Sequence, residues 1–393
     1  MQQSVIVAAK RTPVGAFQGQ LSSLSATDLG AIVIKNLIST IAINPIEINE
    51  VIMGNVLSAG LGQAPARQAA LYANLSNAVQ TLTINKMCGS GLKAVMLADQ
   101  AIRLDDASVV IAGGMESMSN APYILKDARR GHRLGHGKII DSMIHDGLWD
   151  VYTDKHMGNC AEMLSLERSY TRESQDQFAT MSYKKALDAQ KNNIFDSEIV
   201  PIEIKQKKGI SIQINIDEEP SKVRFDKIPN LNPAFQKGGA ITAANASKLN
   251  DGAAAMILMS EQKANLLNIN PIAKIICHAS YAHDPEWFTT APAKAIGKVL
   301  DKSGLTVDQI DLWEINEAFS AVTMAAIDDY NIDPKKVNIY GGAVALGHPI
   351  GASGARIMTT LLNGLNHKKT ARYGLATLCI GGGEASAIIL EKL

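Results

Sequence analysis

A cysteine followed by three small residues is the first feature of the sequence that could carry chemistry. Cys88 lies in INKMCGSGLKAVMLADQAIR, with Gly89, Ser90 and Gly91 directly behind it and a predicted helix after them. Small residues let the backbone turn sharply and approach a ligand, and the free N–H groups of a helix start point toward the turn. We therefore expect a stabilised, reactive thiolate at Cys88. The alternative is a small buried core residue, the commonest fate of a free cysteine.

Two further candidates lie in the last third of the chain, His348 in LGHPIGASG and Cys379 in YGLATLCIGGG. Pro349 stops helix formation at the histidine, and the glycines open a close turn. Cys379 ends an apolar run and enters a run of glycines, which predicts a place at the mouth of a buried strand. The alternatives are a structural histidine and a core cysteine at a strand end.

An internal repeat suggests that the three reactive residues share one site. CGSGLKAVMLADQAIRLDDASVVIAGGMES is similar to HPIGASGARIMTTLLNGLNHKKTARYGLATLCIGGGEAS: each reads as a reactive residue, Ser-Gly, a helix, a buried strand, Gly-Gly and Glu. The matched pairs are Ser90-Gly91 with Ser353-Gly354 and Gly113-Gly114 with Gly381-Gly382. Two similar halves that face each other would bring both turns together, which predicts a catalytic arrangement.

The elements that must position these residues are predicted from short apolar runs that alternate with helix-length segments. This alternation is typical of βα units and of an α/β protein with a mostly parallel sheet. ASVVIAGG, residues 107–114, is continuously apolar and stopped by two glycines, so we expect a buried strand. The segment from Gly91 to about Arg103 is apolar over most of its circumference, which predicts a buried helix.

Residues 119–239 are charged and rich in loops, and we interpret them as an inserted, lid-like domain. They contain the basic loop KDARRGHRLGHGK (126–138) and a long polar helix that Thr171 is expected to cap. His132 and His136 have a spacing that a metal could use, but one pair without partner ligands favours a solvated loop. Residues 1–118, continued by about 240–270, and residues 271–393 are the predicted N-terminal and C-terminal halves.

Composition limits the classes of function. The 393 residues include 38 basic and 38 acidic side chains, so the balance suggests neither nucleic acid nor an anionic membrane as partner. Cys88, Cys160, Cys277 and Cys379 form no C-x-x-C pair, so no disulfide framework or zinc site is indicated. The N-terminus lacks a signal-peptide pattern and no apolar run reaches the ~18 residues of a membrane span, so we expect a cytoplasmic protein.

Six motifs, in order and at family spacing, give the chain a family resemblance. They are KMCGSGLKA, HMG (156–158), NASKLNDGAAA (245–255), NEAFS (316–320), GGAVALGHPIGASGAR (341–356) and LCIGGGEA (378–385). Together they resemble the signature blocks of the thiolases, and of the short-chain acetyl-CoA acetyltransferases in particular, over essentially the whole chain. The resemblance implies the thiolase fold, in which two similar βα-rich halves pack as a layered α-β-α-β-α sandwich with an inserted loop domain.

The resemblance also implies a reaction, the reversible Claisen condensation of two acetyl-CoA to acetoacetyl-CoA and CoA through S-acetyl-Cys88. His348 would activate Cys88, and Cys379 would be the base that removes a methyl proton. The N–H groups of Cys88 and Gly381 would form one oxyanion hole, and His348 with a water held by Asn316 the other. The residues implied along the pantetheine tunnel of CoA are Leu148, His156, Met157, Phe235, Ala243, Ser247, Ala318 and Phe319. No metal or redox cofactor is expected.

Several alternatives stay open. They are a 3-ketoacyl-CoA thiolase of broader specificity and a non-catalytic acyl-CoA or lipid carrier. A decarboxylating ketosynthase is disfavoured because such enzymes pair their cysteine with two histidines, whereas this chain has Cys379, and a thiol redox protein is disfavoured because no C-x-x-C motif is present. The resemblance places a short-chain pocket wall near Trp287 and Phe288, and it leaves a dimer or a tetramer, with the tetramer preferred. Ala385 stands where the family usually has glycine. No basic residue of the 222–227 segment is assigned to the CoA phosphates, and the physiological direction of the reaction is not predicted.

Overall fold

The computed structural model describes residues 2–205 and 211–393. Met1, in the predicted N-terminal half, and residues 206–210, in the predicted insertion, lie outside the described residues. None of the helices in the described part combines the length and the hydropathy of a membrane span.

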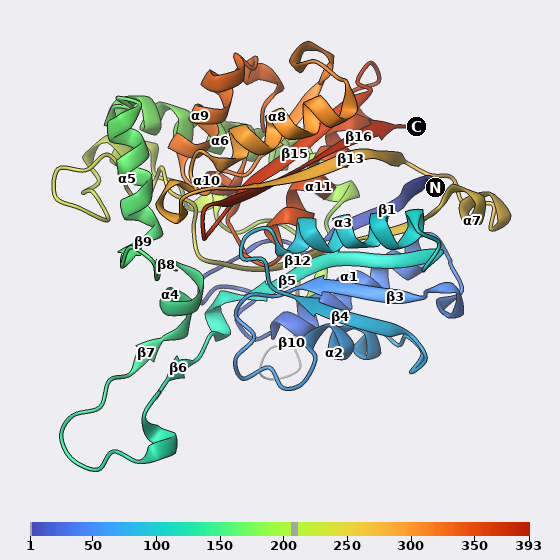
Figure 1. Ribbon diagram of the computed structural model, residues 1–393, viewed down its shortest axis with the longest axis horizontal. Helices are drawn as coiled ribbons and strands as arrows, with labels where there is room; N and C mark the ends of the chain where they lie inside the picture. The colour runs from blue at the N-terminus through green and yellow to red at the C-terminus, as the bar shows by residue number, and fades with distance from the viewer. Residues whose placement is uncertain (1, 206–210) are drawn as a thin grey trace.

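The described strands build a ten-stranded sheet that consists of two similar halves (Figure 1). The first half has the order β1 (Ser4–Arg11), β12 (Asn250–Ser260), β5 (Val109–Ser117), β3 (Glu50–Gly54) and β4 (Gln80–Ile84), with β2 (Gly15–Ala16) also paired to β12. The second has the order β13 (Ala273–Ala282), β16 (Glu384–Lys392), β15 (Tyr373–Ile380) and β14 (Leu312–Ile315). Pairing of β1 with β13 at Val5 and Ile6 joins the halves.

Both halves repeat the same pattern of pairing, which confirms the internal repeat. From the joining strands outward, the first two pairings are antiparallel and the third is parallel in each half. The prediction of a mostly parallel sheet is wrong, because among the described strands of the sheet only β3 with β4 and β5 and β14 with β15 pair in parallel. The prediction was based on continuous apolar runs, which are typical of parallel strands. Here helices cover both faces of each half, so antiparallel strands are also buried on both faces and lack the usual apolar–polar alternation.

Helices form the other three of the expected five layers (Figure 1). α3 (Ser90–Arg103) and α11 (Ser353–His367) pack against each other between the two halves. A Cβ on Gly354 would lie 2.7 Å from Cβ of Leu92, so the Ser-Gly starts of the two helices lie face to face. The outer helices are α1 (Ala26–Thr40) and α2 (Pro65–Tyr72) on one side and α8 (Ala291–Ser303) and α9 (Ser320–Tyr330) on the other.

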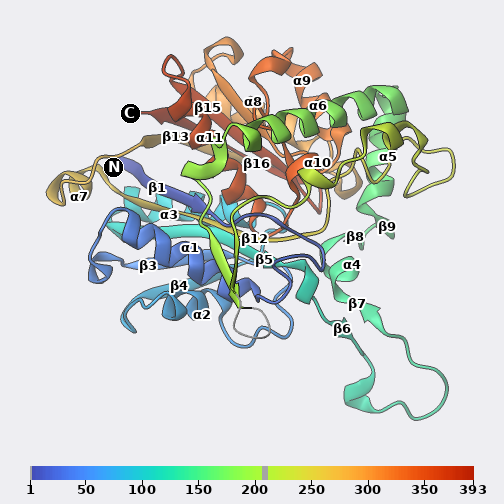
Figure 2. The same ribbon diagram turned by 180° about the vertical axis from the view of Figure 1, so that it is seen from behind.

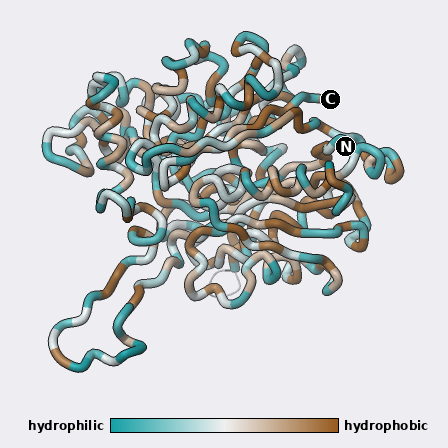
Figure 3. Tube along the Cα trace, viewed as in Figure 1, coloured by the Kyte–Doolittle hydropathy of each residue, from teal (hydrophilic) through white to brown (hydrophobic). Residues whose placement is uncertain are grey.

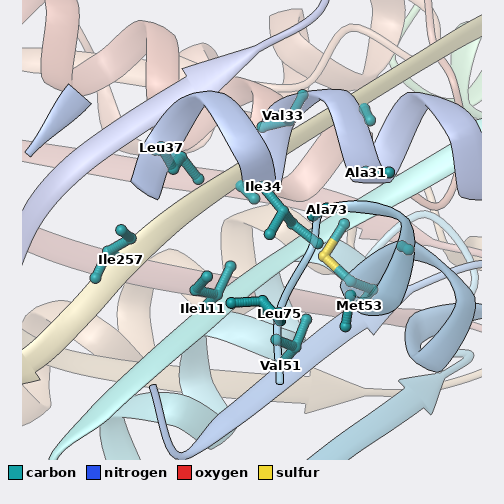
Figure 4. Packing of buried hydrophobic residues seen from close by; sticks show 14 of the residues in the cluster. Ala31, Val33, Ile34, Leu37, Val51, Met53, Ala73, Leu75, Ile111 and Ile257 are labelled. Atoms are coloured by element: carbon teal, nitrogen blue, oxygen red, sulfur yellow. The ribbon is translucent and has the colours of Figure 1, made fainter. Parts of the chain in front are cut away.

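The cores lie between these layers. In the first half, Ile34 and Leu37 of α1 lie over Val51 and Met53 of β3 and Ile111 of β5, all fully buried (Figure 4). Figure 3 shows hydrophobic residues concentrated along the strands. The predicted buried helix is α3, which packs against β3, β5 and β12 of the first half and against α11. Most of its residues are buried, so this prediction is confirmed.

The predicted strand at residues 107–114 is real but does not end at the two glycines. β5 continues to Ser117 and is buried throughout. A Cβ on Gly113 would come within 2.2 Å of the Ala254 carbonyl, and one on Gly114 within 2.0 Å of the Gly351 carbonyl. The glycines therefore permit close approach by neighbouring backbone, whereas the matched Gly381 and Gly382 form a turn between β15 and β16.

Between β5 and β12 the described strands lie outside the ten-stranded sheet. This segment holds the short strands β6 (Tyr123–Ile124), β7 (Ile140–Asp141), β8 (Trp149–Asp150), β9 (Lys155–His156), β10 (Ile202–Lys205) and β11 (Ser211–Ile214) and the helices α4 (Ser142–Gly147), α5 (Met157–Glu167) and α6 (Arg172–Lys191). The loop between β6 and β7 projects far from the body (Figure 1), and α6 crosses the second half on the reverse side (Figure 2). The Thr171 side chain accepts from the Ser174 N–H, so the predicted cap of α6 is confirmed. The domain boundaries at 118/119 and 239/240 stay predictions.

Candidate active site

Cys88 lies in the turn between β4 and α3. Gly89 caps the helix next to it, and a Cβ at this glycine would come within 2.3 Å of Cδ1 of Ile380 at the end of β15. β15 also carries Cys379. The small residues behind Cys88 therefore allow a close approach between its turn and the opposite half of the chain.

The electrostatics of Cys88 differ from the expectation. The thiol is partly accessible, yet burial raises the pKa of Cys88 to about 11, and the charge of Glu116 adds to the rise. The backbone N–H groups of Gly381 and of Cys88 itself oppose this pKa shift but do not cancel it. The prediction of a stabilised thiolate is therefore wrong, and the resting group is a thiol, because desolvation disfavours the charged form more than two N–H groups favour it.

His348 lies in the loop between the short helix α10 (Ala343–Leu346) and α11. Its N–H donates to Oδ1 of Asn250 at 2.8 Å, and Gly347, with φ 106°, makes the turn before it. Its Nδ1 lies 2.6 Å from Oγ of Ser353, and this hydroxyl donates to the Pro349 carbonyl at 2.9 Å. A hydroxyl has one hydrogen, so Oγ of Ser353 accepts from Nδ1–H of His348.

The hydrogen bond to Ser353 determines which nitrogen of His348 can accept a proton. With the hydrogen on Nδ1, Nε2 has a free lone pair. Nε2 is buried and has no hydrogen-bond partner among the described residues. Burial, aided by the charge of Arg356, lowers the pKa of His348 to about 3, so the imidazole is neutral at physiological pH. His348 is therefore a neutral imidazole whose Nε2 can accept a proton.

Cys379 lies in β15, one residue before this strand ends at Ile380. Its side chain is fully buried, and burial followed by the charge of Cys88 raises the pKa of Cys379 well above its usual value. Cys379 pairs with Ala385 across the β15–β16 hairpin, and Ala385 is fully buried. The methyl group therefore fits at the position where the family resemblance predicts glycine.

One cavity of about 360 Å³ is lined by Cys88, His348 and Cys379 together. Twelve of the thirteen site residues predicted from the sequence line it. They are Cys88, Leu148, His156, Met157, Phe235, Ala243, Ser247, Ala318, Phe319, His348, Cys379 and Gly381. The two halves and the segment between β5 and β12 thus contribute to one continuous wall, and the roles of these residues stay proposals.

Aromatic rings build the part of the wall that lies away from the thiols. The rings of His156 and Phe235 stack with centroids 4.8 Å apart, and Phe319 meets Phe235 edge-on at 6.1 Å. Nδ1 of His156 accepts from the Gly158 N–H and caps α5, and burial lowers the pKa of His156. Ser247 donates its backbone N–H to the Ala318 carbonyl, which holds these two predicted tunnel residues together. The wall is largely apolar.

Asn316 is the one predicted site residue that does not line the cavity. It follows β14, its N–H donates to the Thr377 carbonyl at 3.0 Å, and its side chain is 1% exposed. Both Oδ1 and Nδ2 lack a partner among the described residues. A buried amide with two unpaired polar atoms suits a bound water, so the predicted role stays a prediction that the chemistry of the site supports.

The predicted pocket wall is present in part. Phe288, 3% exposed, lines the cavity and packs in one cluster with Met157, Phe319 and Cys379, whereas Trp287 does not line it. Other lining residues were not predicted. They are Met118, Met143, Ile144, Gly147, Ala234, Thr242, Ala246, Lys248, Leu249 and Ile350. The only feature of the sequence that could have indicated these residues is their proximity to the motifs, as for Ile350, which lies two residues after His348.

The predicted basic loop is exposed, including His132 and His136. Within residues 2–205 and 211–393, no cluster of three or more His, Cys, Asp and Glu side chains is arranged to hold a metal ion. The pair therefore gains no further ligand from the fold in the described part of the chain.

Comparison with known proteins gives the family. The thiolase N-terminal domain model matches residues 4–262, and the thiolase C-terminal domain model matches residues 269–392. The chain is 49% identical over 393 residues to the acetyl-CoA acetyltransferase of Pseudomonas aeruginosa, with 100% of both chains covered. It is 50% identical over 388 residues to acetyl-CoA acetyltransferase 1 of Arabidopsis thaliana, covering 98% of this chain and 93% of the relative. The crystal structure of the Acat5 thiolase of Ascaris suum in complex with coenzyme A superposes with a TM-score of 0.94, 44% identity and 100% coverage of both chains. The chain therefore belongs to the thiolase family.

Proposed function

We propose that the chain is an acetyl-CoA C-acetyltransferase that reversibly converts two acetyl-CoA to acetoacetyl-CoA and CoA through S-acetyl-Cys88. The observation that carries the proposal is that the thiols of Cys88 and Cys379 share one cavity with His348, whose Nε2 is free to accept a proton. The names of the relatives and the full-length similarity support the same activity.

Acyl transfer begins from neutral groups. The raised pKa of Cys88 and the lowered pKa of His348 both favour the thiol and the neutral imidazole. Nε2 therefore takes the thiol proton while Sγ attacks the carbonyl carbon, so that no isolated thiolate has to be buried. The N–H groups of Gly381 and Cys88 lie beside Sγ and are suited to stabilise the oxyanion that forms.

The cleavage reaction gives a role to the second thiol, Cys379, which is protonated at rest. Cys88 attacks the 3-keto carbon of acetoacetyl-CoA, and the bond between the second and third carbons of the acyl chain breaks. The Cys379 thiol protonates the carbon of the departing enolate, which leaves as acetyl-CoA. A thiol with a raised pKa suits this step, because it stays protonated until a strong carbon base is next to it.

The second half of the cleavage reaction restores the resting groups. CoA attacks the acetyl group on Cys88, its thiol proton goes to the Cys379 thiolate, and the Cys88 thiolate takes the proton back from His348. Condensation is the same path in reverse, with the Cys379 thiolate as the base that removes the methyl proton. His348 and a water held by Asn316 would bind the enolate oxygen.

The rest of the cavity suits the pantetheine arm of CoA. Its wall is apolar and aromatic around His156, Phe235 and Phe319, and Ser247 supplies a hydroxyl for an amide of the arm. The chemistry uses only groups of the chain and its two thioesters, so no metal or redox cofactor is needed.

The alternatives lack an equal observation. A broader 3-ketoacyl-CoA thiolase would need room for a longer acyl chain where the ring of Phe288 lines the cavity. A carrier has no use for two thiols and a free Nε2 on one wall, and a decarboxylating ketosynthase pairs its cysteine with two histidines, whereas this chain has Cys379. A thiol redox protein is disfavoured because no C-x-x-C motif is present.

We propose a cytoplasmic homo-oligomer, a tetramer in preference to a dimer. The loop between β6 and β7 supports this, because it projects from the body and carries exposed apolar side chains, among them Leu134 and Ile139. Large exposed apolar residues on a projecting loop suit contacts between subunits.

Thiolysis of acetoacetyl-CoA by CoA tests the function. We expect wild-type protein to form acetyl-CoA and Cys88→Ser to form none, because serine keeps the volume but is a far weaker nucleophile. Cys277→Ser is the matched control, since Cys277 is a buried cysteine that does not line the cavity. Full activity of Cys88→Ser, or an inactive wild type, would contradict the proposal.

A further inference from the structure

Glu116, at the end of β5, is a fully buried carboxylate that the reaction above does not use. It accepts four hydrogen bonds. Its Oε1 binds Nδ2 of Asn55 at 2.8 Å and the Leu57 N–H at 3.1 Å, and its Oε2 binds the Val56 N–H at 3.1 Å and the Gly351 N–H at 2.8 Å. It does not line the cavity. Four donors on one carboxylate suit the charged form, which accepts only.

The four donors come from both halves of the chain. Asn55, Val56 and Leu57 follow β3 in the first half, whereas Gly351 lies three residues after His348 in the second. Val56 and Leu57 also pack in one buried cluster with Ile350, and Cys88 packs against that cluster. Glu116 thus ties the His348 loop to the wall beside Cys88.

The contact at Gly351 is tight. A Cβ on Gly351 would come within 2.7 Å of Oε2 of Glu116 and 3.1 Å of Cα of Asn55. Gly114 on β5 leaves room for the Gly351 carbonyl on the other side. The His348 loop therefore packs tightly against β5, and Glu116 supplies a polar contact to it there.

The internal repeat provides a second, independent observation. Glu384 occupies the position in the second half that Glu116 occupies in the first, two residues after the matched glycines. Glu384 pairs with Nζ of Lys86, two residues before Cys88. In each half, therefore, a glutamate contacts the loop of the other half that carries Cys88 or His348.

We propose that Glu116 is a positioning residue that holds the His348 loop so that Nε2 of His348 meets the Cys88 thiol. This inference rests on the proposed function. Glu116 acts through Gly351 and does not touch substrate.

Glu116→Gln is the principal test variant. The amide keeps the volume but turns one acceptor atom into a donor, so at least one of the four N–H groups faces another N–H. Loss of one hydrogen bond to a buried charged group should lower kcat roughly 10- to 100-fold. The KM for CoA should stay within about twofold, because the aromatic tunnel lies on other elements.

The pH profile separates positioning from general destabilisation. Burial raises the pKa of Glu116 to about 7, with the charge of Asp251 on β12 adding to the rise. The other titratable groups facing the site are Cys88 and His348, whose pKa values lie near 11 and 3. Wild-type kcat should therefore fall below about pH 7 as Glu116 gains a proton, and Glu116→Gln should lose this acid limb. Identical profiles for the two proteins would overturn the proposal.

Asp99→Asn is the matched control, because Asp99 is a buried carboxylate in α3 that pairs with Arg103 and His278 away from the cavity. It should lose stability but keep kcat. Gly351→Ala tests the same contact from the other side if Glu116→Gln does not fold. Its added methyl should displace the loop and lower kcat, and wild-type kcat in this variant would overturn the proposal.

Hydrogen exchange distinguishes failure of the inference from failure of the proposed function. The peptide containing the Gly351 amide should exchange faster in Glu116→Gln than in wild type and in Asp99→Asn, whether or not the protein cleaves acetoacetyl-CoA. Unchanged exchange would overturn the inference. If exchange is faster in Glu116→Gln but wild-type protein does not cleave acetoacetyl-CoA, the positioning role is supported and the proposed function is contradicted.

Discussion

Removing the hydroxyl of Ser353 should disable His348 without touching the cavity. In Ser353→Ala, Nδ1–H of His348 loses the acceptor that lies 2.6 Å away, inside a region from which solvent is excluded. The imidazole can relieve this by moving its hydrogen to Nε2, and that tautomer cannot accept the Cys88 proton.

The magnitude follows from the cost of the unpaired donor. A buried donor without a partner costs about 1–3 kcal/mol, which lowers the fraction of the base-competent tautomer roughly 5- to 150-fold. We expect kcat for thiolysis and the single-turnover rate of Cys88 acetylation to fall by the same factor, because His348 acts in both. The KM for CoA should change little, since Ser353 does not line the cavity.

Ser165→Ala is the control for this prediction. Oγ of Ser165 donates to the Ala161 carbonyl one turn earlier and accepts from Nε2 of Gln175, and Ser165 does not line the cavity. Its loss should lower Tm to a similar extent but leave both rates unchanged. If Ser353→Ala folds and retains kcat within about twofold of wild type, the assignment of Nε2 as the base is wrong.

The other predictions concern the second thiol and the acyl pocket. Cys379→Ser should still acetylate Cys88, because His348 serves that step, but thiolysis and condensation should collapse; loss of acetylation as well would show that Cys379 has another role. Wild type should prefer acetoacetyl-CoA to longer 3-ketoacyl-CoAs, since each rejected methylene is worth only ~1–3 kcal/mol and exclusion builds with length. Phe288→Ala should narrow the difference in kcat/KM between four- and eight-carbon substrates, while Phe195→Ala, a buried ring outside the cavity, should not. Equal kcat/KM for both lengths in wild type would refute the short-chain assignment.

The sequence pointed to three residues that line one cavity, Cys88, His348 and Cys379, because each one is embedded in a local pattern. Cys88 and His348 occupy matching places before a Ser-Gly helix start, and the fold places the two helices face to face. Cys379 has its glycine turn directly after it. Such short motifs specify a local backbone geometry that depends on residues adjacent in sequence. They can therefore be identified from the sequence without knowledge of the fold.

Features that depend on distant neighbours were not predictable in the same way. The predicted direction of strand pairing was wrong, because a strand buried on both faces has the same apolar composition whether it pairs in parallel or antiparallel. The rise in the pKa of Cys88 follows from burial by both halves, which a local pattern does not report. Glu116 was visible in the repeat, but its role depends on the N–H of Gly351, which lies 235 positions away.

The central claim is that Cys88 accepts the acetyl group, and mass spectrometry of the peptides after mixing with acetyl-CoA tests it most directly. The account predicts one acetyl group on the peptide that contains Cys88, removed again when CoA is added. It predicts none on the peptides of Cys160, Cys277 or Cys379. An acetyl group on another residue, or turnover of acetyl-CoA without acetylation of Cys88, would contradict the account.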